Sequence, residues 1–163
     1  MTEPRNEFAA LPLAQRTLLW CMRMWAMQLR HGAETQERVG NMLGQLGAPT
    51  APPHLERFMY ALMHGTTREL EVLCVCRTEV VADERALLDV VSLAQVKRSL
   101  EALLVLRTVL PAEGASAALH SAEEIGAALA QAGRFLPTPD ENIRRFALVA
   151  GSTPAHPAHH VLH

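Results

Sequence analysis

The pair Cys74 and Cys76 is the first feature of the sequence whose residue types and spacing could do chemistry. Two cysteines separated by one residue can bind a metal ion or cycle between a dithiol and a disulfide. The remaining cysteine, Cys21, is distant in sequence, and a structural zinc site usually takes four ligands at recognisable spacing. We therefore interpret the cysteines as buried or partly buried structural residues. A ligand or metal site at Cys74, Cys76 and His64 is the alternative.

The 8 histidines fall into two groups. Four are isolated within the expected fold and are interpreted as helix-end or surface residues: His31, His54, His64 and His120. The other four crowd the end of the chain: His156, His159, His160 and His163. Imidazoles bind nickel, copper and zinc, but a flexible tail usually does so adventitiously. We therefore expect no cofactor.

Common catalytic and nucleotide-binding motifs are missing from the sequence. It has no GxSxG elbow, no phosphate-binding glycine loop, no HExxH zinc motif and no glycine-rich dinucleotide turn. Carboxylate pairs occur at 83–84, 123–124 and 140–141, each at the start of a predicted helix, where capping and the helix dipole explain them. The sequence therefore favours a non-enzymatic protein, and no catalytic residue is assigned.

Composition limits the class of protein and its partners. A chain of 163 residues with 49% hydrophobic residues suits one domain with a sizeable core. The formal net charge of -2 gives no general attraction to nucleic acid or anionic membranes, and no apolar run is long enough for a membrane span. The odd number of cysteines and the polar start favour a reducing, cytoplasmic compartment. Lys97 is the only lysine, and this strong preference for arginine is typical of a GC-rich bacterial genome.

The segment 83–110 is predicted to be the element around which the fold is organised. It contains no glycine or proline, opens with Asp83 and Glu84, and is followed by Pro111, which disfavours a helix in the residue before it. Its second half is apolar on nearly every side, and such helices are usually buried all round. We therefore expect one long central helix in an all-α, single-domain bundle of five or six helices.

The other predicted elements follow from apolar spacing, prolines, glycines and capping motifs. A strand at 69–75 is rejected because no other segment could pair with it. The expected helices are 12–31, 34–46, 53–77, 121–132 and 139–150, with a loop or short helix at 112–120. The expected organisation is a flexible arm at 1–10, a helical domain at 11–151 and a disordered tail rich in histidine and proline at 152–163.

The first predicted helix has a second apolar side, which we call the Trp20 ridge. It consists of Trp20, Met24 and Met27, flanked by Arg16 and Arg23, on the side away from the better-formed core stripe. The ridge is either internal core or an interaction surface, because monomers seldom expose large contiguous apolar patches. A twofold dimer through the ridge would bury it most simply.

Three classes of function follow from these features. The leading hypothesis is a non-enzymatic helical interaction or regulatory module, self-associating or binding a protein partner through the Trp20 ridge. The second is a small-ligand or metal-dependent sensor or enzyme with its site near Cys74, Cys76 and His64. A DNA-binding regulator is the weakest of the three, because the linker before the third helix is long for a helix-turn-helix and that helix presents only Arg57 as a base reader.

Overall fold

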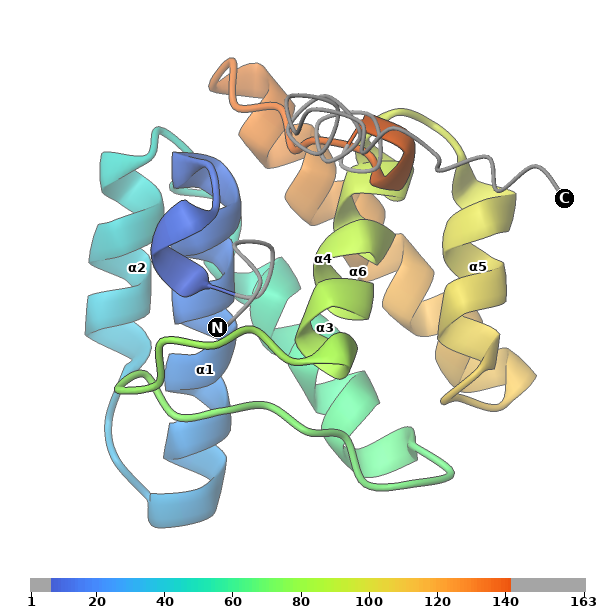
Figure 1. Ribbon diagram of the computed structural model, residues 1–163, viewed down its shortest axis with the longest axis horizontal. Helices are drawn as coiled ribbons and strands as arrows, with labels where there is room; N and C mark the ends of the chain where they lie inside the picture. Colours follow the sequence, from blue (N-terminus) through green and yellow to red (C-terminus); the bar gives the residue numbers. More distant parts are fainter. Residues whose placement is uncertain (1–6, 142–163) are drawn as a thin grey trace, which may run out of the picture.

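The computed structural model describes residues 7–141, and these residues are helical apart from their connections (Figure 1). No strand forms within them, so the all-α prediction is confirmed; a single isolated bridge joins Glu7 and Glu79. The elements are a short 3₁₀ helix, η2 (Phe8–Ala10), and the α-helices α1 (Leu13–His31), α2 (Gln36–Gln45), α3 (Pro52–Gly65), α4 (Ala82–Gln95), α5 (Ser99–Arg107) and α6 (Ala112–Gln131).

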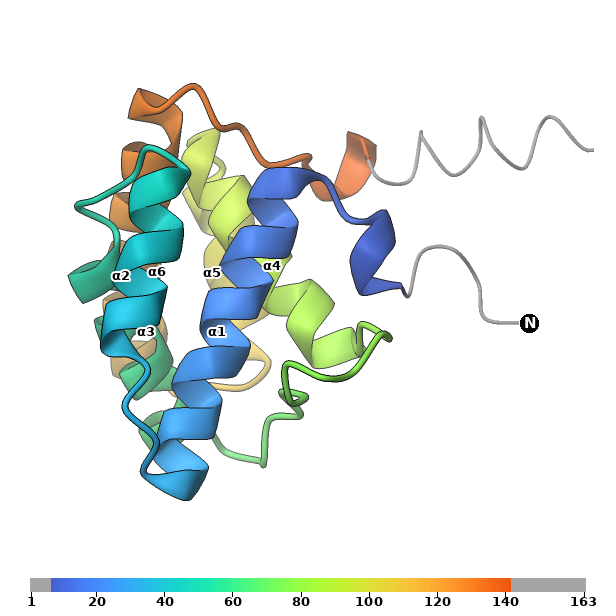
Figure 2. The same cartoon turned by 90° about the vertical axis from the view of Figure 1, so that its left-hand side faces the viewer.

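The helices pack in two groups that share α3 and α4. On one side α1 packs against α2, α3 and α4, and on the other α6 packs against α3, α4 and α5. Figures 1 and 2 show α1 and α2 at one side of the molecule and α5 at the opposite side. The largest fully buried apolar side chains come from five of the helices and include Leu18, Met22, Leu43, Phe58, Leu88 and Leu106.

The single long helix predicted at 83–110 is wrong, because the chain turns between α4 and α5. Lys97 adopts the left-handed conformation with φ 65°. The amide of Arg98 donates to the carbonyl of Leu93 at 2.9 Å, and the amide of Lys97 donates to the carbonyl of Ala94 at 3.1 Å. These two bonds form a Schellman motif, which ends a helix and usually has glycine at the left-handed position. A lysine there provides no sequence signal.

The third helix ends at Gly65, so the prediction that it extends to residue 77 is also wrong. Thr66 is extended, and the amide of Thr67 donates to the carbonyl of Val109 at 2.9 Å. From 66 to 81 the chain is irregular, and we call this stretch the 66–81 loop. Buried and exposed side chains alternate at 69–72, as in an extended chain. Within the described residues no strand pairs with them, as expected from the sequence.

The region after Pro111 forms one helix rather than a loop followed by a helix. Ser121, predicted to cap a helix at 121–132, lies buried in the middle of α6. The second predicted capping box does form. The amide of Thr138 donates to Glu141 Oε2 at 3.1 Å, and the amide of Glu141 approaches Thr138 Oγ1 at 3.5 Å. The rest of the helix predicted at 139–150 lies outside the described residues.

The described residues include only part of the predicted N-terminal arm and none of the predicted tail. Residues 1–6 of the predicted arm and all of the predicted tail at 152–163 lie outside the described residues. The described part of the arm contacts the 66–81 loop, since the amide of Phe8 donates to the carbonyl of Thr78 at 2.7 Å. η2 therefore packs against the loop that carries Cys74 and Cys76.

Candidate functional site

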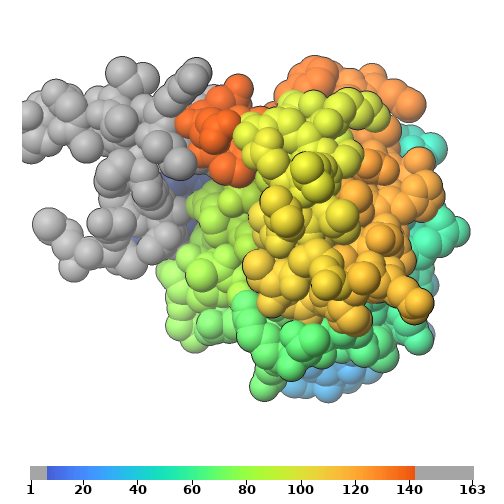
Figure 3. Space-filling view, turned by 90° about the vertical axis from the view of Figure 1, so that its right-hand side faces the viewer, coloured from blue at the N-terminus to red at the C-terminus, as the bar shows by residue number. Residues whose placement is uncertain are grey.

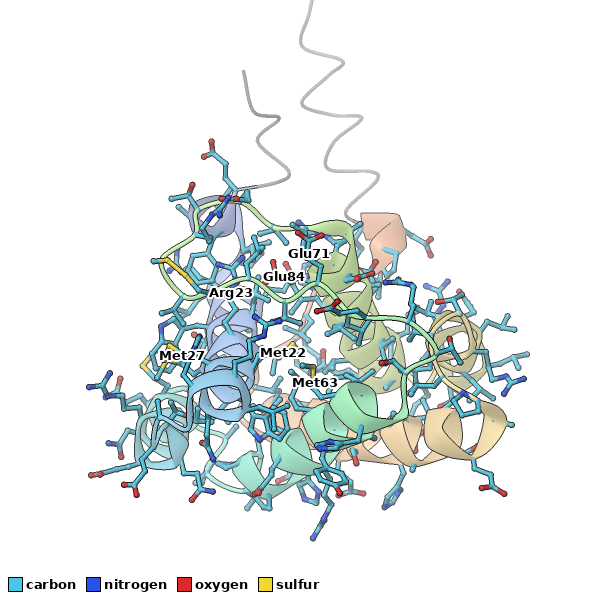
Figure 4. The ribbon with its side chains drawn as sticks, turned by 90° about the horizontal axis from the view of Figure 1, so that it is seen from below. Met22, Arg23, Met27, Met63, Glu71 and Glu84 are labelled. Carbon is cyan, nitrogen blue, oxygen red and sulfur yellow. A yellow bond between two sulfur atoms is a disulfide. The ribbon has the colours of Figure 1, made fainter. Side chains whose placement is uncertain are left out.

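A buried ion pair between α1 and α4 forms the base of the candidate site. Arg23 Nε donates to Glu84 Oε1 at 2.7 Å, and Arg23 Nη2 donates to Glu84 Oε2 at 2.8 Å. The two side chains are only 1% and 0% exposed. Figure 4 shows them facing each other in the gap between the two helices. A bidentate pair of this kind is among the stronger charged contacts in proteins.

The same two side chains hold the backbone of the 66–81 loop. Arg23 donates to the carbonyls of Arg77 at 2.8 Å and Glu79 at 2.6 Å. Glu84 accepts from the amide of Leu73 at 3.0 Å and from the amide of Val81 at 3.2 Å. Apart from the isolated bridge between Glu79 and Glu7, the loop has no strand partner among the described residues. These bonds therefore replace hydrogen bonds that a helix or sheet would supply. The ion pair thus fixes the backbone on both sides of the cysteines.

Asp83 provides the loop with a second attachment at its outer edge. Arg68 donates to both carboxylate oxygens of Asp83, at 2.9 and 2.6 Å, and the amide of Glu71 donates to Oδ2 at 2.8 Å. The hydrogen bond from Arg68 lowers the pKa of Asp83, and the bond from the Glu71 amide acts in the same direction. The two acidic residues that open α4 therefore both bind the preceding loop, whereas their position in the sequence indicated only a capping role.

Cys74 and Cys76 form a disulfide in this loop, and both are exposed. On a helix their side chains would point about 200° apart, but the loop is not helical and their Cα atoms lie 5.5 Å apart. The disulfide lies at the outer edge of the molecule in Figure 4. Cys21 is different: it is buried and free, and burial raises the pKa of its thiol to about 12. Only Cys21 matches the expectation of buried cysteines.

An open cavity of about 470 Å³ lies beside the disulfide. Arg30 on α1 forms one wall, and its Nη1 donates to the carbonyl of Val72 at 2.7 Å. The cavity is lined by Arg30, Glu69, Leu70, Glu71, Val72, Leu73, Cys74 and Arg77. Two arginines, two glutamates and one cysteine therefore border one small volume.

His64, which the sequence grouped with the two cysteines, does not line this cavity. It lies at the end of α3, where its ring stacks on Tyr60 with centroids 4.1 Å apart. Within residues 7–141, no three histidine, cysteine, aspartate or glutamate side chains are grouped so that they could hold a metal ion. Of the three residues of the predicted ligand or metal site, the structure therefore brings together only Cys74 and Cys76.

The members of the Trp20 ridge are covered to different extents within the chain. Met24 is 2% exposed and packs in the core, and Arg23 is engaged by Glu84. Trp20 and Met27 are partly buried against the core, and Arg16 is partly exposed. An interface between chains through this ridge stays a prediction, with only its outer part accessible.

The most exposed large apolar side chains of the described residues include two on α5. Leu100 is 71% exposed and Leu104 is 61% exposed. They are four residues apart and therefore share one face of the helix, which we call the α5 face. Figure 3 shows α5 across the middle of one side of the molecule. Sequence reasoning missed this surface because it expected 100–110 to be buried all round.

Comparison with models of known protein families, with curated proteins and with solved structures finds no match for this chain. The function must therefore be argued from the geometry alone. Among the described helices, none combines the length and apolar character that crossing a bilayer requires.

Proposed function

We propose that this protein is a non-enzymatic helical interaction module that forms a twofold dimer through the α5 face. The exposure of Leu100 and Leu104 carries the proposal. Exposure of two neighbouring leucine side chains to water is unfavourable, and burial of both against a partner would be favourable. Ala102 and Leu106, on the opposite side of α5, are buried in the core, so α5 is held firmly while it presents the leucines.

Charge complementarity favours a second copy of the chain as the partner. In an antiparallel pairing of two α5 helices about Leu104, residues equally far from Leu104 lie opposite each other. Glu101 of one copy then faces Arg107 of the other, and the same contact recurs across the twofold axis. Glu101 already accepts from Arg98 in its own chain, so it would bridge two arginines. Exposed ion pairs of this kind set the register, while the leucines supply most of the affinity.

Sedimentation velocity and native mass spectrometry at micromolar concentration test the proposal. The wild type is expected to be a dimer, and Leu104→Glu, which places a charge on the axis, is expected to give a folded monomer. Tyr60→Glu on α3 is the matched control, because Tyr60 is 59% exposed and lies on another helix. It is expected to remain dimeric. A monomeric wild type would overturn the proposal.

Two further comparisons locate the interface. Glu101→Arg and Arg107→Glu should each weaken the dimer by roughly five- to tenfold, and the double variant should recover the affinity. Trp20→Glu distinguishes the α5 face from the Trp20 ridge. If Trp20→Glu yields a folded monomer while Leu104→Glu stays dimeric, the interface lies on α1 and the α5 assignment is wrong.

A further inference from the structure

The Cys74–Cys76 disulfide differs from a structural cross-link in its position. It spans a single intervening residue, lies in an exposed loop and borders an open cavity. A cross-link over so short a stretch removes little entropy from the unfolded chain, because that entropy grows with loop length. Both cysteine residues are exposed, which favours attack by an external thiolate, as exchange requires.

The loop backbone is held on both sides of the disulfide by bonds that do not depend on it. Leu73, just before Cys74, donates to Glu84, and Arg77, just after Cys76, accepts from Arg23. Arg23 and Glu84 form a buried ion pair, so these anchors persist when the sulfur–sulfur bond opens. The two thiols of the reduced form stay within reach of each other, so the bond can close again without refolding.

The cavity wall indicates the class of thiol that would reach the disulfide. Arg30 suits a carboxylate, as does Arg77, which also pairs with Glu79. Glu69 and Glu71 suit an ammonium group. All four line the cavity together with Cys74, whereas Cys76 does not. A volume of about 470 Å³ is within the range of small-ligand sites. A peptide thiol with free amino and carboxylate groups could bind the arginines and glutamates and also react with Cys74. An uncharged thiol could only react with Cys74.

We propose that Cys74 and Cys76 form a redox-active pair that exchanges with a low-molecular-weight peptide thiol of the glutathione type, with Cys74 as the attacking sulfur. In the oxidising direction, the Cys74 thiolate attacks glutathione disulfide. A bond forms between Cys74 and one glutathione, and the other glutathione leaves as a thiolate and takes up a proton. The Cys76 thiolate then attacks the Cys74 sulfur and releases the second glutathione. Two electrons and two protons pass from the protein dithiol to one disulfide, which gives two thiols.

Equilibration of the full chain in glutathione redox buffers, followed by alkylation and mass spectrometry, tests whether the pair is active. The expected result is one reversible two-electron transition between a dithiol and the Cys74–Cys76 disulfide, with the fold retained in both states. Cys21 should resist alkylation until the protein is unfolded, because its thiol is buried. A pair that closes only after unfolding, or that glutathione disulfide cannot oxidise, would overturn the proposal.

Single-cysteine variants test the assigned roles. Cys76→Ser should accumulate a mixed disulfide between Cys74 and glutathione, and Cys74→Ser should form its adduct at Cys76 roughly tenfold more slowly. In the Cys76→Ser background, Arg30→Gln should slow the reaction with glutathione disulfide several-fold but leave the reaction with uncharged hydroxyethyl disulfide unchanged. Equal rates at the two cysteines would refute the role of Cys74. An equal effect of Arg30→Gln on both reagents would refute recognition by charge.

Discussion

Arg23 and Glu84 are 61 residues apart in sequence, yet they form the most deeply buried charged contact of the described chain. Their side chains together make four hydrogen bonds to the backbone of the 66–81 loop. Removing a charged pair from water is costly, and the cost is offset only when the remaining polar atoms are also bonded. Here the loop supplies those bonds, so the ion pair and the loop conformation depend on each other.

Replacement of Glu84 by glutamine should therefore destabilise the protein strongly. The variant keeps the shape of the side chain, but it leaves the Arg23 charge uncompensated and retains one acceptor oxygen for two loop amides. We expect a loss of about 3–5 kcal/mol in the free energy of unfolding, measured by urea denaturation. Hydrogen exchange at the amides of Leu73 and Val81 should accelerate more than exchange within α6.

A double-mutant cycle provides the control for this prediction. Arg23→Gln should cost a similar amount, and the double variant Arg23→Gln/Glu84→Gln should cost clearly less than the sum of the two. The coupling energy expected for groups in direct contact is about 1–3 kcal/mol. Additive losses would show that the two side chains stabilise the loop independently.

Asp89 on α4 should make stability depend on pH in the opposite sense to a typical surface carboxylate. Burial raises its pKa from 3.8 to about 6, and its Oδ1 atom is buried with no hydrogen-bond partner. Between pH 4 and 6 the folded state therefore binds more protons at Asp89 than the unfolded state. The contribution of this group to the free energy of unfolding accordingly falls as the pH rises.

Asp89→Asn should remove this dependence. We expect the variant to be more stable than the wild type at pH 7 by about 1–2 kcal/mol, a value reduced for the partial exposure of the group. The two proteins should be nearly equal at pH 4. Asp83→Asn is the matched control. The pKa of Asp83 is lowered by Arg68, so its contribution is present at neutral pH and lost in acid. A variant of Asp89 that is less stable than the wild type at pH 7 would contradict the prediction.

The helices that the sequence predicted well are those that end on local signals. α1 ends at His31, as predicted from the apolar spacing and from Gly32. This glycine follows the helix directly and adopts φ 66°. Thr138 and Glu141 make the capping box that their spacing indicated. In these cases the residues that decide the structure are neighbours in sequence, so the pattern contains the information.

The elements that the sequence predicted wrongly are decided by distant contacts or by unusual residues. Helical spacing continues through 66–77, but Arg23 and Glu84 bind the backbone there in an irregular conformation. Only the folded chain brings those partners together. The same loop allows Cys74 and Cys76 to form a disulfide, which a helical conformation would exclude. The cysteine motif was visible in sequence, whereas the cavity and its arginines depend on the loop path.

The turn between α4 and α5 leads to a last prediction, because Lys97 occupies a position that normally favours glycine. Its φ of 65° is costly for a residue with a Cβ atom, and its side chain is exposed, so little packing is lost on substitution. Lys97→Gly should raise the free energy of unfolding by about 0.5–1 kcal/mol and the melting temperature by about 2–4 °C, measured by calorimetry. Lys97→Ala should give no such gain, because alanine retains the Cβ atom.

Gly133→Ala supplies the reverse comparison. Gly133 has φ 69°, and no atom lies within 4 Å of the place that a Cβ atom would take, so the loss of about 1 kcal/mol expected there reports backbone conformation alone. A Lys97→Gly variant no more stable than Lys97→Ala would show that the left-handed turn carries no strain at this position.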